Sequence, residues 1–357
     1  MGKIKGIVIQ LLIGAAVGFA FGYLLAQMEG VNIVLAVPAL VVGYILNVIL
    51  HELGHMIAGL ISGYQFSSFR IFNITWVVED GKIKMKKFSI QGTAGQCLMI
   101  PPEGKGLDYP VVFYNLGGVI MNFITAVIFI ALGFAVDNPI FFVIALPGIF
   151  FMILNGIPLK INGMPNDGEN AFHLKKNRIA MKSMDIQLRC NALQMEGVRL
   201  KDMPEEWFQI EEEPDWKNIH VCSLAYFNLC RKLELEKYEE CEAEIKELLA
   251  KDTALVEIYR NELKCELISM YIKENRYHEA EKMYHEMEGY LKKTMMFLEH
   301  YPLMFGYWKL VKEDEEEAQK LLEAYQKKRE TYPYKSAIIA ADEEIDNIMC
   351  LQLSCQM

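Results

Sequence analysis

Charge is distributed very unevenly along this 357-residue chain. Residues 1–168 carry 9 lysines and arginines and 8 aspartates and glutamates, whereas residues 169–357 carry 27 and 38. Long uncharged stretches in the first part are typical of helices that cross a bilayer, because a charge within hydrocarbon is costly. The simplest account is a membrane domain over residues 1–168 followed by an acidic soluble domain. The net charge of −10 argues against nucleic acid as a partner.

An HExxH sequence at residues 51–55 lies within one of the most apolar stretches of the chain. On a helix, His51 and His55 are one turn apart on one face, so both imidazoles can bind one Zn²⁺ while Glu52 reaches a water on the metal. A glutamate at membrane depth costs about 2.5 kcal/mol or more, so such residues usually pair, bind an ion or face a cavity. We therefore expect half of a hydrolytic zinc site here. The alternative is a pair of histidines that only pack in a core.

Four uncharged stretches suit membrane helices, since about 20 apolar residues cross the hydrocarbon at 1.5 Å per residue. They are Gly6–Met28, part of Val31–Ser62, Pro110–Val136 and Ile140–Asn155. We expect the second helix to begin near Pro38, because proline favours a first helical turn. The alternative for the first stretch is a cleaved signal peptide, but its length and the closely following second stretch favour an uncleaved helix.

The basic residues predict the orientation in the membrane. With four crossings, the lysines and arginines of the first domain fall on one side, whereas Glu29 and Asp137 are the only charges on the other. The positive-inside rule then places both termini and the acidic domain in the cytoplasm of a multi-pass cell-membrane protein. None of the eight cysteines forms a CxxC pair, so we expect buried free thiols, which agrees with a reducing compartment.

A β-hairpin is predicted between the second and third helices. Two stretches rich in β-branched and aromatic residues, Phe69–Val78 and Lys82–Ile90, flank an Asp80-Gly81 turn. The next segment, Gln91–Gly106, contains glycine and proline and is expected to be a loop. A strand edge beside an active site could pair with an extended peptide. The alternative is a solvated hairpin with no role.

A catalytic zinc with two histidines and a water lacks one protein ligand, which is usually a carboxylate. The fourth apolar stretch ends in Asn-Gly-Ile-Pro at residues 155–158, and Asp167-Gly168 follows. With the HExxH sequence, these residues resemble the site-2 protease family of intramembrane zinc metalloproteases, which combines HExxH on one transmembrane helix with NxxP and DG on a later one. The resemblance implies that His51, His55 and Asp167 bind zinc and that Glu52 is the catalytic base.

Two asparagines extend the resemblance. Residues 117–122, Gly-Gly-Val-Ile-Met-Asn, look like the GxxxN element of the family. The implied role of Asn122 and Asn155 is to bind the substrate backbone or stabilise the oxyanion, and the alternative for both is interhelical hydrogen bonding. The spacing from Asn155 to Asp167 is longer than is usual in the family, which favours an insertion after Pro158. The alternative for Asp167 is a helix-capping role.

The acidic part of the chain has a helical pattern, with a connecting segment over residues 169–215 and a more regular part over 216–357. A weak repeat places the small residues Cys241, Ala280 and Ala318 at intervals of 39 and 38 positions. This resembles tetratricopeptide-like helical hairpins, although their usual period is shorter. Such a domain could bind a cytoplasmic protein or peptide on a concave face. The alternative is a helical cap that only stabilises the rest of the protein.

The expected fold is an α-helical membrane protein with four transmembrane helices, a membrane-associated β-hairpin and an all-α helical-repeat domain. The expected function is an intramembrane zinc endopeptidase that cleaves membrane-anchored proteins in or near the bilayer. One alternative is a non-proteolytic membrane scaffold whose metal site is vestigial and whose repeat domain recruits a partner. Another is a zinc-dependent processor of prenylated or small secreted peptides.

Overall fold

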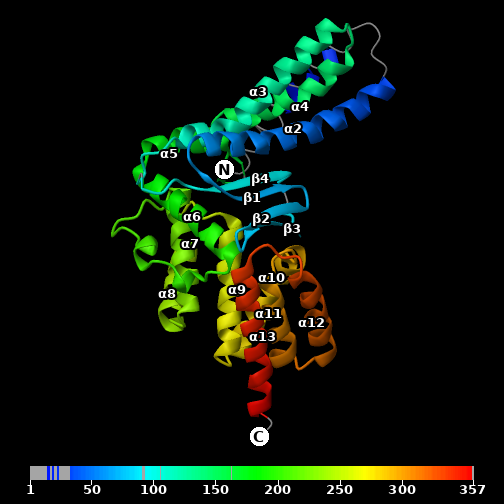
Figure 1. The fold of residues 1–357 in the computed structure, drawn as a ribbon. Helices are drawn as coiled ribbons and strands as arrows, with labels where there is room; N and C mark the ends of the chain where they lie inside the picture. Colours follow the sequence, from blue (N-terminus) through cyan, green and yellow to red (C-terminus); the bar gives the residue numbers. More distant parts are fainter. Residues whose placement is uncertain are drawn as a thin grey trace. The chain divides into compact units, whose positions relative to one another are not determined.

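The computed structural model describes residues 14–16, 18–19, 22–23, 33–90, 93–104, 106–161 and 163–355. These residues are mostly helical, with a few short antiparallel strands (Figure 1). The chain forms two compact units. The first comprises Met1–Phe72 and Thr93–Asp185, and the second comprises Asn73–Gly92 and Ile186–Met357. A short segment from the middle of the first unit's sequence therefore belongs to the second unit.

Three apolar helices make up most of the first unit. They are α2 (Ile33–Ile61), α3 (Val111–Ala135) and α4 (Ile140–Gly156), and each packs against the other two. The segments Val34–Ile61 and Val111–Ala135 are long and apolar enough to cross a membrane. Only 28% of the most apolar window of each is buried, whereas the core helix of a water-soluble protein is mostly buried.

The prediction of four membrane-crossing helices is not supported. Helix α4 has 17 residues, fewer than the roughly 20 that a crossing needs. The predicted first helix, Gly6–Met28, lies outside the described residues apart from the few positions given above. The predicted start of α2 near Pro38 was also wrong, because the helix begins at Ile33 and contains the proline. Proline removes one backbone hydrogen bond there, and the helix continues through it.

Glycines allow α2 and α3 to approach very closely. A Cβ atom added to Gly54 of α2 would stand 2.8 Å from the carbonyl carbon of Gly117 on α3. The reverse also holds, since a Cβ atom on Gly117 would stand 2.8 Å from the carbonyl carbon of Gly54. Small residues at a helix crossing let backbones meet. The HExxH face of α2 is thereby held directly against α3.

Strands β1 (Gln65–Ile71) and β4 (Gly95–Ile100) form an antiparallel pair in the first unit. Gln65 lies opposite Ile100 and Ile71 lies opposite Gly95. The prediction of a loop over residues 91–106 was therefore wrong for β4. Strand β4 runs beside α2, where the Met99 side chain fills the space left by Gly59. Pairing with a distant strand, which local sequence does not reveal, stabilises this segment.

The predicted Asp-Gly hairpin is confirmed for strands β2 (Ile74–Glu79) and β3 (Lys82–Lys87). Asp80 and Gly81 have φ values of 54° and 70°, as a tight two-residue hairpin turn requires. The first predicted strand, Phe69–Val78, is instead interrupted near Phe72, whose φ is 52°. The hairpin belongs to the second unit.

The hairpin is anchored in the second unit by an aromatic side chain. Phe88 is 4% exposed and its ring packs edge-on against Tyr332 and Tyr334, with centroids 5.4 and 6.1 Å away. At the turn, the Lys335 Nζ atom lies 3.4 Å from a carboxylate oxygen of Asp80. The hairpin and the C-terminal helices thus share one core.

After α4 the chain makes a tight hairpin of two-residue strands before the next helix. Strands β5 (Lys160–Ile161) and β6 (Met164–Pro165) pair with each other, and α5 (Asp167–Lys176) follows at once. This small hairpin occupies the stretch between Pro158 and Asp167, where the sequence predicts an insertion. Helix α6 (Arg178–Glu196) then continues the chain.

The second unit consists mainly of helical hairpins. Its helices are η1 (Leu200–Asp202), η2 (Glu205–Phe208), α7 (Ile219–Glu234), α8 (Tyr238–Ala250), α9 (Glu257–Lys273), α10 (Tyr277–Lys293), α11 (His300–Gly306), η3 (Tyr307–Val311), α12 (Glu315–Arg329) and α13 (Lys335–Cys355). Helices α8, α10 and α12 each begin two residues after a residue with positive φ, namely Glu236, Asn275 and Glu313. These turns recur at 39 and 38 residues, the same intervals as the small residues of the predicted repeat.

Among the described side chains seven cysteines are free thiols, and five of these are buried, as predicted.

Candidate metal centre

Three predicted ligands converge at one point in the first unit. The Nε2 atoms of His51 and His55, one turn apart on α2, are 3.2 Å from each other. The Oδ2 atom of Asp167, the first residue of α5, lies 3.1 Å from His51 Nε2 and 3.4 Å from His55 Nε2. These three side chains form a group that could hold a metal ion.

The spacing of the three atoms fits a tetrahedral metal ion. Ligand bonds of about 2.0–2.2 Å at tetrahedral angles separate neighbouring ligand atoms by about 3.3–3.5 Å. The observed separations of 3.1, 3.2 and 3.4 Å are close to this value. In addition, Asp167 Oδ2 is buried and accepts no hydrogen bond, so a cation would satisfy it. Among the described residues, no fourth histidine, cysteine or carboxylate joins these three.

Both imidazoles are oriented by acceptors on α3. The Nδ1 atom of His51 lies 2.6 Å from Asn122 Oδ1, and the Nδ1 atom of His55 lies 2.9 Å from the carbonyl oxygen of Tyr114. When Nδ1 donates to such an acceptor, Nε2 presents its lone pair to a metal. Gly118 leaves room for both rings, because a Cβ atom there would stand 2.6 Å from each.

Asn166 places Asp167 at the start of α5. Its Oδ1 atom accepts hydrogen bonds from the amides of Glu169 and Leu159, at 2.9 and 3.1 Å. Its Nδ2 atom donates to the carbonyl oxygens of Leu154 and Ile157, both at 2.7 Å, and so ties α5 to the end of α4. Sequence reasoning missed this residue, although an asparagine followed three positions later by glutamate is a helix-start signal. The capping role considered for Asp167 is filled by its neighbour.

The Asp167 carboxylate is in an environment that favours its charge. Burial by itself raises the pKa of this group, but the influence of the neighbouring His55 and His51 outweighs it. The pKa of Asp167 therefore lies below its usual range. An ionised carboxylate is the form that binds a divalent cation.

Glu52 lies against strand β4, the segment predicted to be a loop. It is 9% exposed, and a Cβ atom added to Gly95 would stand 2.5 Å from its Oε1 atom. The buried Arg70 guanidinium holds this wall in place, since it donates to Thr93 Oγ1 at 2.6 Å and to the Gly95 carbonyl oxygen at 3.3 Å. Neither Gly95 nor Arg70 belongs to a motif that the sequence analysis singled out.

The two predicted asparagines differ in their relation to the centre. Asn122 is fully buried and contacts His51 directly. Asn155 is near the end of α4, where its backbone closely approaches Gly168. In the part of the chain that the structure describes, the Asn155 side chain makes no hydrogen bond to His51, His55 or Asp167.

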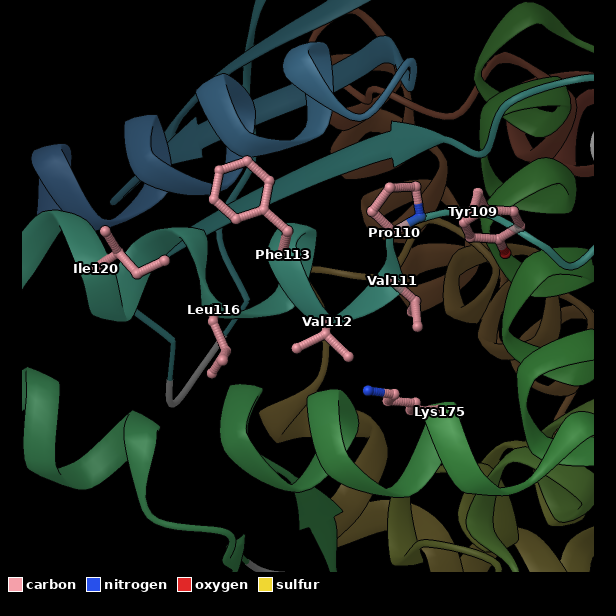
Figure 2. Close-up of a pocket in the computed structure, with 8 residues that line it drawn as sticks. All are labelled: Tyr109, Pro110, Val111, Val112, Phe113, Leu116, Ile120 and Lys175. Carbon is pink, nitrogen blue, oxygen red and sulfur yellow. The ribbon is translucent and has the colours of Figure 1, made fainter.

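A separate cavity of about 390 Å³ lies at the beginning of α3. Its apolar wall includes Val112, Leu116 and Ile120, which recur every fourth residue, and Lys175 of α5 extends towards Val112 (Figure 2). The residues of α3 that meet α2, Gly117 and Gly118, are not part of this lining. The cavity is therefore distinct from the candidate metal centre.

No family model, curated protein or solved structure matches the chain. The motifs and the geometry of the candidate metal centre are therefore the features that bear on its function.

Proposed function

We propose that this protein is an intramembrane zinc metalloendopeptidase that hydrolyses peptide bonds of membrane-anchored proteins in or near the bilayer. The observation that carries the proposal is the convergence of His51, His55 and Asp167 at tetrahedral spacing, on and beside a helix apolar enough to cross a membrane. Glu52 is next to this group on the same helix. The arrangement is the one that the resemblance to site-2 proteases implies.

Zinc is the metal that the ligand set favours. Two imidazole nitrogens and one carboxylate oxygen, with one position left for water, are typical of catalytic Zn²⁺ sites. When bound, Zn²⁺ makes a water molecule acidic enough to act near neutral pH and polarises the scissile carbonyl. In the proposed mechanism Glu52 takes the proton from the attacking water and passes it to the leaving amine. His51, His55 and Asp167 hold the metal, while β4 keeps Glu52 in place.

The substrate must present an extended backbone to this centre. Carbonyl groups within a helix are already hydrogen-bonded, so a membrane-spanning substrate must unwind before it is attacked. We propose that the unwound segment passes the Gly95 end of β4, where Glu52 lies. Further along β4 the Cys97 carbonyl oxygen already accepts a hydrogen bond from the Tyr114 hydroxyl, at 3.0 Å. Binding of substrate by Asn155 stays a prediction.

We also propose that the protein is a multi-pass protein of the cell membrane with both termini and the second unit in the cytoplasm. The outward-facing apolar residues of α2 and α3 support a membrane location. Exposed residues of this kind include Val34, Val41, Phe123 and Phe134, at 72, 53, 54 and 76%. The orientation also requires that Gly6–Met28 and α4 cross the membrane, and with these crossings the distribution of basic residues supports it.

A second candidate function is a membrane scaffold that recruits a cytoplasmic protein or peptide through the second unit. The observation that favours it is the repeated helical hairpin, because stacked helical repeats commonly form extended binding surfaces. The intact group of His51, Glu52, His55 and Asp167 favours the peptidase, since a scaffold has no use for it.

Membrane proteomics can separate the two functions. Cells that carry Glu52→Gln should accumulate an intact membrane-anchored protein and lose its shortened fragment, because the carboxylate that moves the proton is absent. Glu103→Gln, in an exposed loop, is the matched control and should leave cleavage unchanged. If Glu52→Gln changes nothing while deletion of residues 216–357 gives a phenotype, the scaffold is the better account.

A further inference from the structure

Two fully buried asparagines, Asn47 on α2 and Asn122 on α3, form a connected pair beside the candidate metal centre. Asn122 Nδ2 donates to the backbone oxygen of Asn47 at 3.0 Å and to its Oδ1 atom at 3.2 Å. At its other end, Asn122 Oδ1 faces His51 Nδ1 at 2.6 Å. One amide thus connects Asn47 to a predicted metal ligand.

The asparagine pair determines which end of the Asn122 amide faces the histidine. A carboxamide has one donating end and one accepting end. If the Asn122 amide were reversed, its oxygen would face two acceptor oxygens of Asn47, and its NH₂ group would face His51. Three acceptors would then meet in a buried site, which is costly. Asn47 therefore selects the orientation in which the oxygen of Asn122 faces His51.

That orientation determines the form of the His51 ring. An oxygen atom at Nδ1 requires a proton on Nδ1, so Nε2 has a free lone pair for a metal ion. An NH₂ group in its place would require the lone pair on Nδ1 and the proton on Nε2. The second form cannot bind a metal through Nε2, the atom that faces Asp167.

The two histidines differ in whether an additional residue is needed to determine the group that faces Nδ1. His55 Nδ1 faces the backbone carbonyl oxygen of Tyr114, which can only accept a hydrogen bond. His51 faces an amide, which can present either end. The additional partner occurs only on the side of His51, where the orientation would otherwise be ambiguous.

Asn47 itself is held in one position. Its Nδ2 atom donates to the Gly43 carbonyl oxygen at 2.9 Å, which leaves Oδ1 to face Asn122. Gly148 of α4 provides the space, because a Cβ atom there would stand 2.6 Å from Asn47 Oδ1. Three helices therefore contribute to one orientation.

We infer that Asn47 is a positioning residue for the metal centre, which acts through Asn122 to keep His51 in the form that binds metal through Nε2. This inference rests on the proposed metal centre. It does not require that the protein be a peptidase.

A double-mutant cycle on the purified full-length protein tests the inference. The measurement is the Zn²⁺ dissociation constant, obtained by competition with a chelator. Asn122→Ala should weaken Zn²⁺ binding by about 10–100-fold, the usual effect of losing a partner of a metal-bound histidine. Asn47→Ala removes Oδ1 but keeps the backbone oxygen as one acceptor for Asn122, so it should weaken binding less, by about two- to tenfold. The double variant should bind no more weakly than Asn122→Ala alone, because both changes remove the same connection.

Two further variants make the result specific. Asn115→Ala removes another buried asparagine of α3, one that donates only to Val111 of its own helix at 2.8 Å, and should leave Zn²⁺ binding unchanged. Asn47→Asp, which burial keeps protonated, retains an oxygen that can accept from Asn122 and a hydroxyl that can donate to Gly43, so it should bind Zn²⁺ more tightly than Asn47→Ala. Elution of every variant as the same folded species in size-exclusion chromatography excludes general unfolding as the cause.

Three results would overturn the inference. They are wild-type affinity in Asn47→Ala, a double variant whose loss is the product of the two single losses, and an Asn47→Asp variant as weak as Asn47→Ala. A wild-type protein without affinity for Zn²⁺ would overturn both this inference and the proposed function. A wild-type protein that binds Zn²⁺ but cleaves no membrane protein would overturn only the proposed function.

Discussion

The helices of the first unit expose apolar side chains and bury polar ones, whereas those of the second unit do the reverse. In the first unit Val34 and Phe134 are 72 and 76% exposed, while Asn47 and Asn122 are fully buried. In the second unit Leu263 and Ile268 are fully buried. Its charged residues pair at the surface, as Lys232 does with Glu240 and Glu244 at 2.6 Å.

This difference shows what each environment requires of a helix. In water, apolar faces drive helices together and charged residues remain outside. In the bilayer proposed for the first unit the outside is already apolar, so close packing by glycine and hydrogen bonds between polar side chains would hold the helices together. Several buried polar groups of the first unit, among them Asn47, His51 and Asn122, also belong to one site. Each of the following predictions tests one part of this contrast.

The largest effect is expected from Asp167→Ala, which removes the only carboxylate of the proposed ligand group. Two imidazoles alone do not make a stable Zn²⁺ site, so the Zn²⁺ content of the purified protein should fall from about one per chain to near zero. Metal analysis after purification measures this. Asp108→Ala removes an exposed carboxylate of the same unit and should leave the content unchanged. Full Zn²⁺ content in Asp167→Ala would remove Asp167 from the ligand group.

Phe88→Ala tests the assignment of the hairpin to the second unit. Truncation of a buried phenylalanine costs about 3–5 kcal/mol, here in the core that contains Tyr332 and Tyr334. Backbone amides of residues 74–87 should then exchange hydrogen roughly a hundredfold faster or more. Ile83→Ala, on the same hairpin but 66% exposed, is the control and should change exchange little. Equal exchange in the two variants would mean that Phe88 does not anchor the hairpin.

Gly54→Ala tests whether glycine packing holds the first unit together. The added methyl group would meet the backbone of Gly117, which cannot rotate away as a side chain can. The methyl group should push α2 and α3 apart and thereby lower the free energy of unfolding by about 1–3 kcal/mol. Zn²⁺ binding should weaken as well. Thermal unfolding in detergent measures the stability.

Gly289→Ala in α10 is the matched change in the second unit. A Cβ atom there meets nothing within 4 Å, so the variant should be neutral or more stable by up to about 1 kcal/mol. If Gly54→Ala is as stable as the wild type, the contrast in packing between the two units is wrong.

Much of the candidate site could be predicted from the sequence because its signals are local or combine into a motif. The spacing of His51 and His55 on a helix and the Asp167-Gly168 pair indicated three side chains that the structure brings together. The Asp80-Gly81 turn and the limits of α3 also follow from nearby residues.

What could not be predicted depends on contacts between distant parts of the chain. The segment of β4 looks like a loop because its stability comes from β1 and α2. The hairpin belongs to the second unit through contacts such as Asp80 with Lys335, which are 255 positions apart in the sequence. Asn47 belongs to no sequence motif. Its hydrogen bond with Asn122 depends on how three helices pack together, which the sequence does not reveal.

The last effect is confined to part of the pH range and comes from a partly buried carboxyl group of the second unit. Burial, as the largest cause, raises the pKa of Glu266 on α9 from its ordinary value of 4.5 to about 7, although Lys273 opposes the shift. Between pH 4.5 and 7 the folded protein therefore binds more protons at this site than the unfolded protein does. The stability of the second unit should fall as the pH rises through this interval.

Glu266→Gln, which cannot ionise, should remove this part of the pH dependence and raise the unfolding free energy at pH 8 by about 1–3 kcal/mol. Denaturant titrations of both proteins at pH 5 and pH 8 measure it. Glu286→Gln, at an exposed position of α10, is the control and should keep the wild-type dependence. A Glu266→Gln protein that loses stability at pH 8 would show that the second unit needs the charge of Glu266. In that case a charge inside the second unit would stabilise it. The two units would then differ in what their surfaces expose, but not in whether polar groups stabilise their interiors.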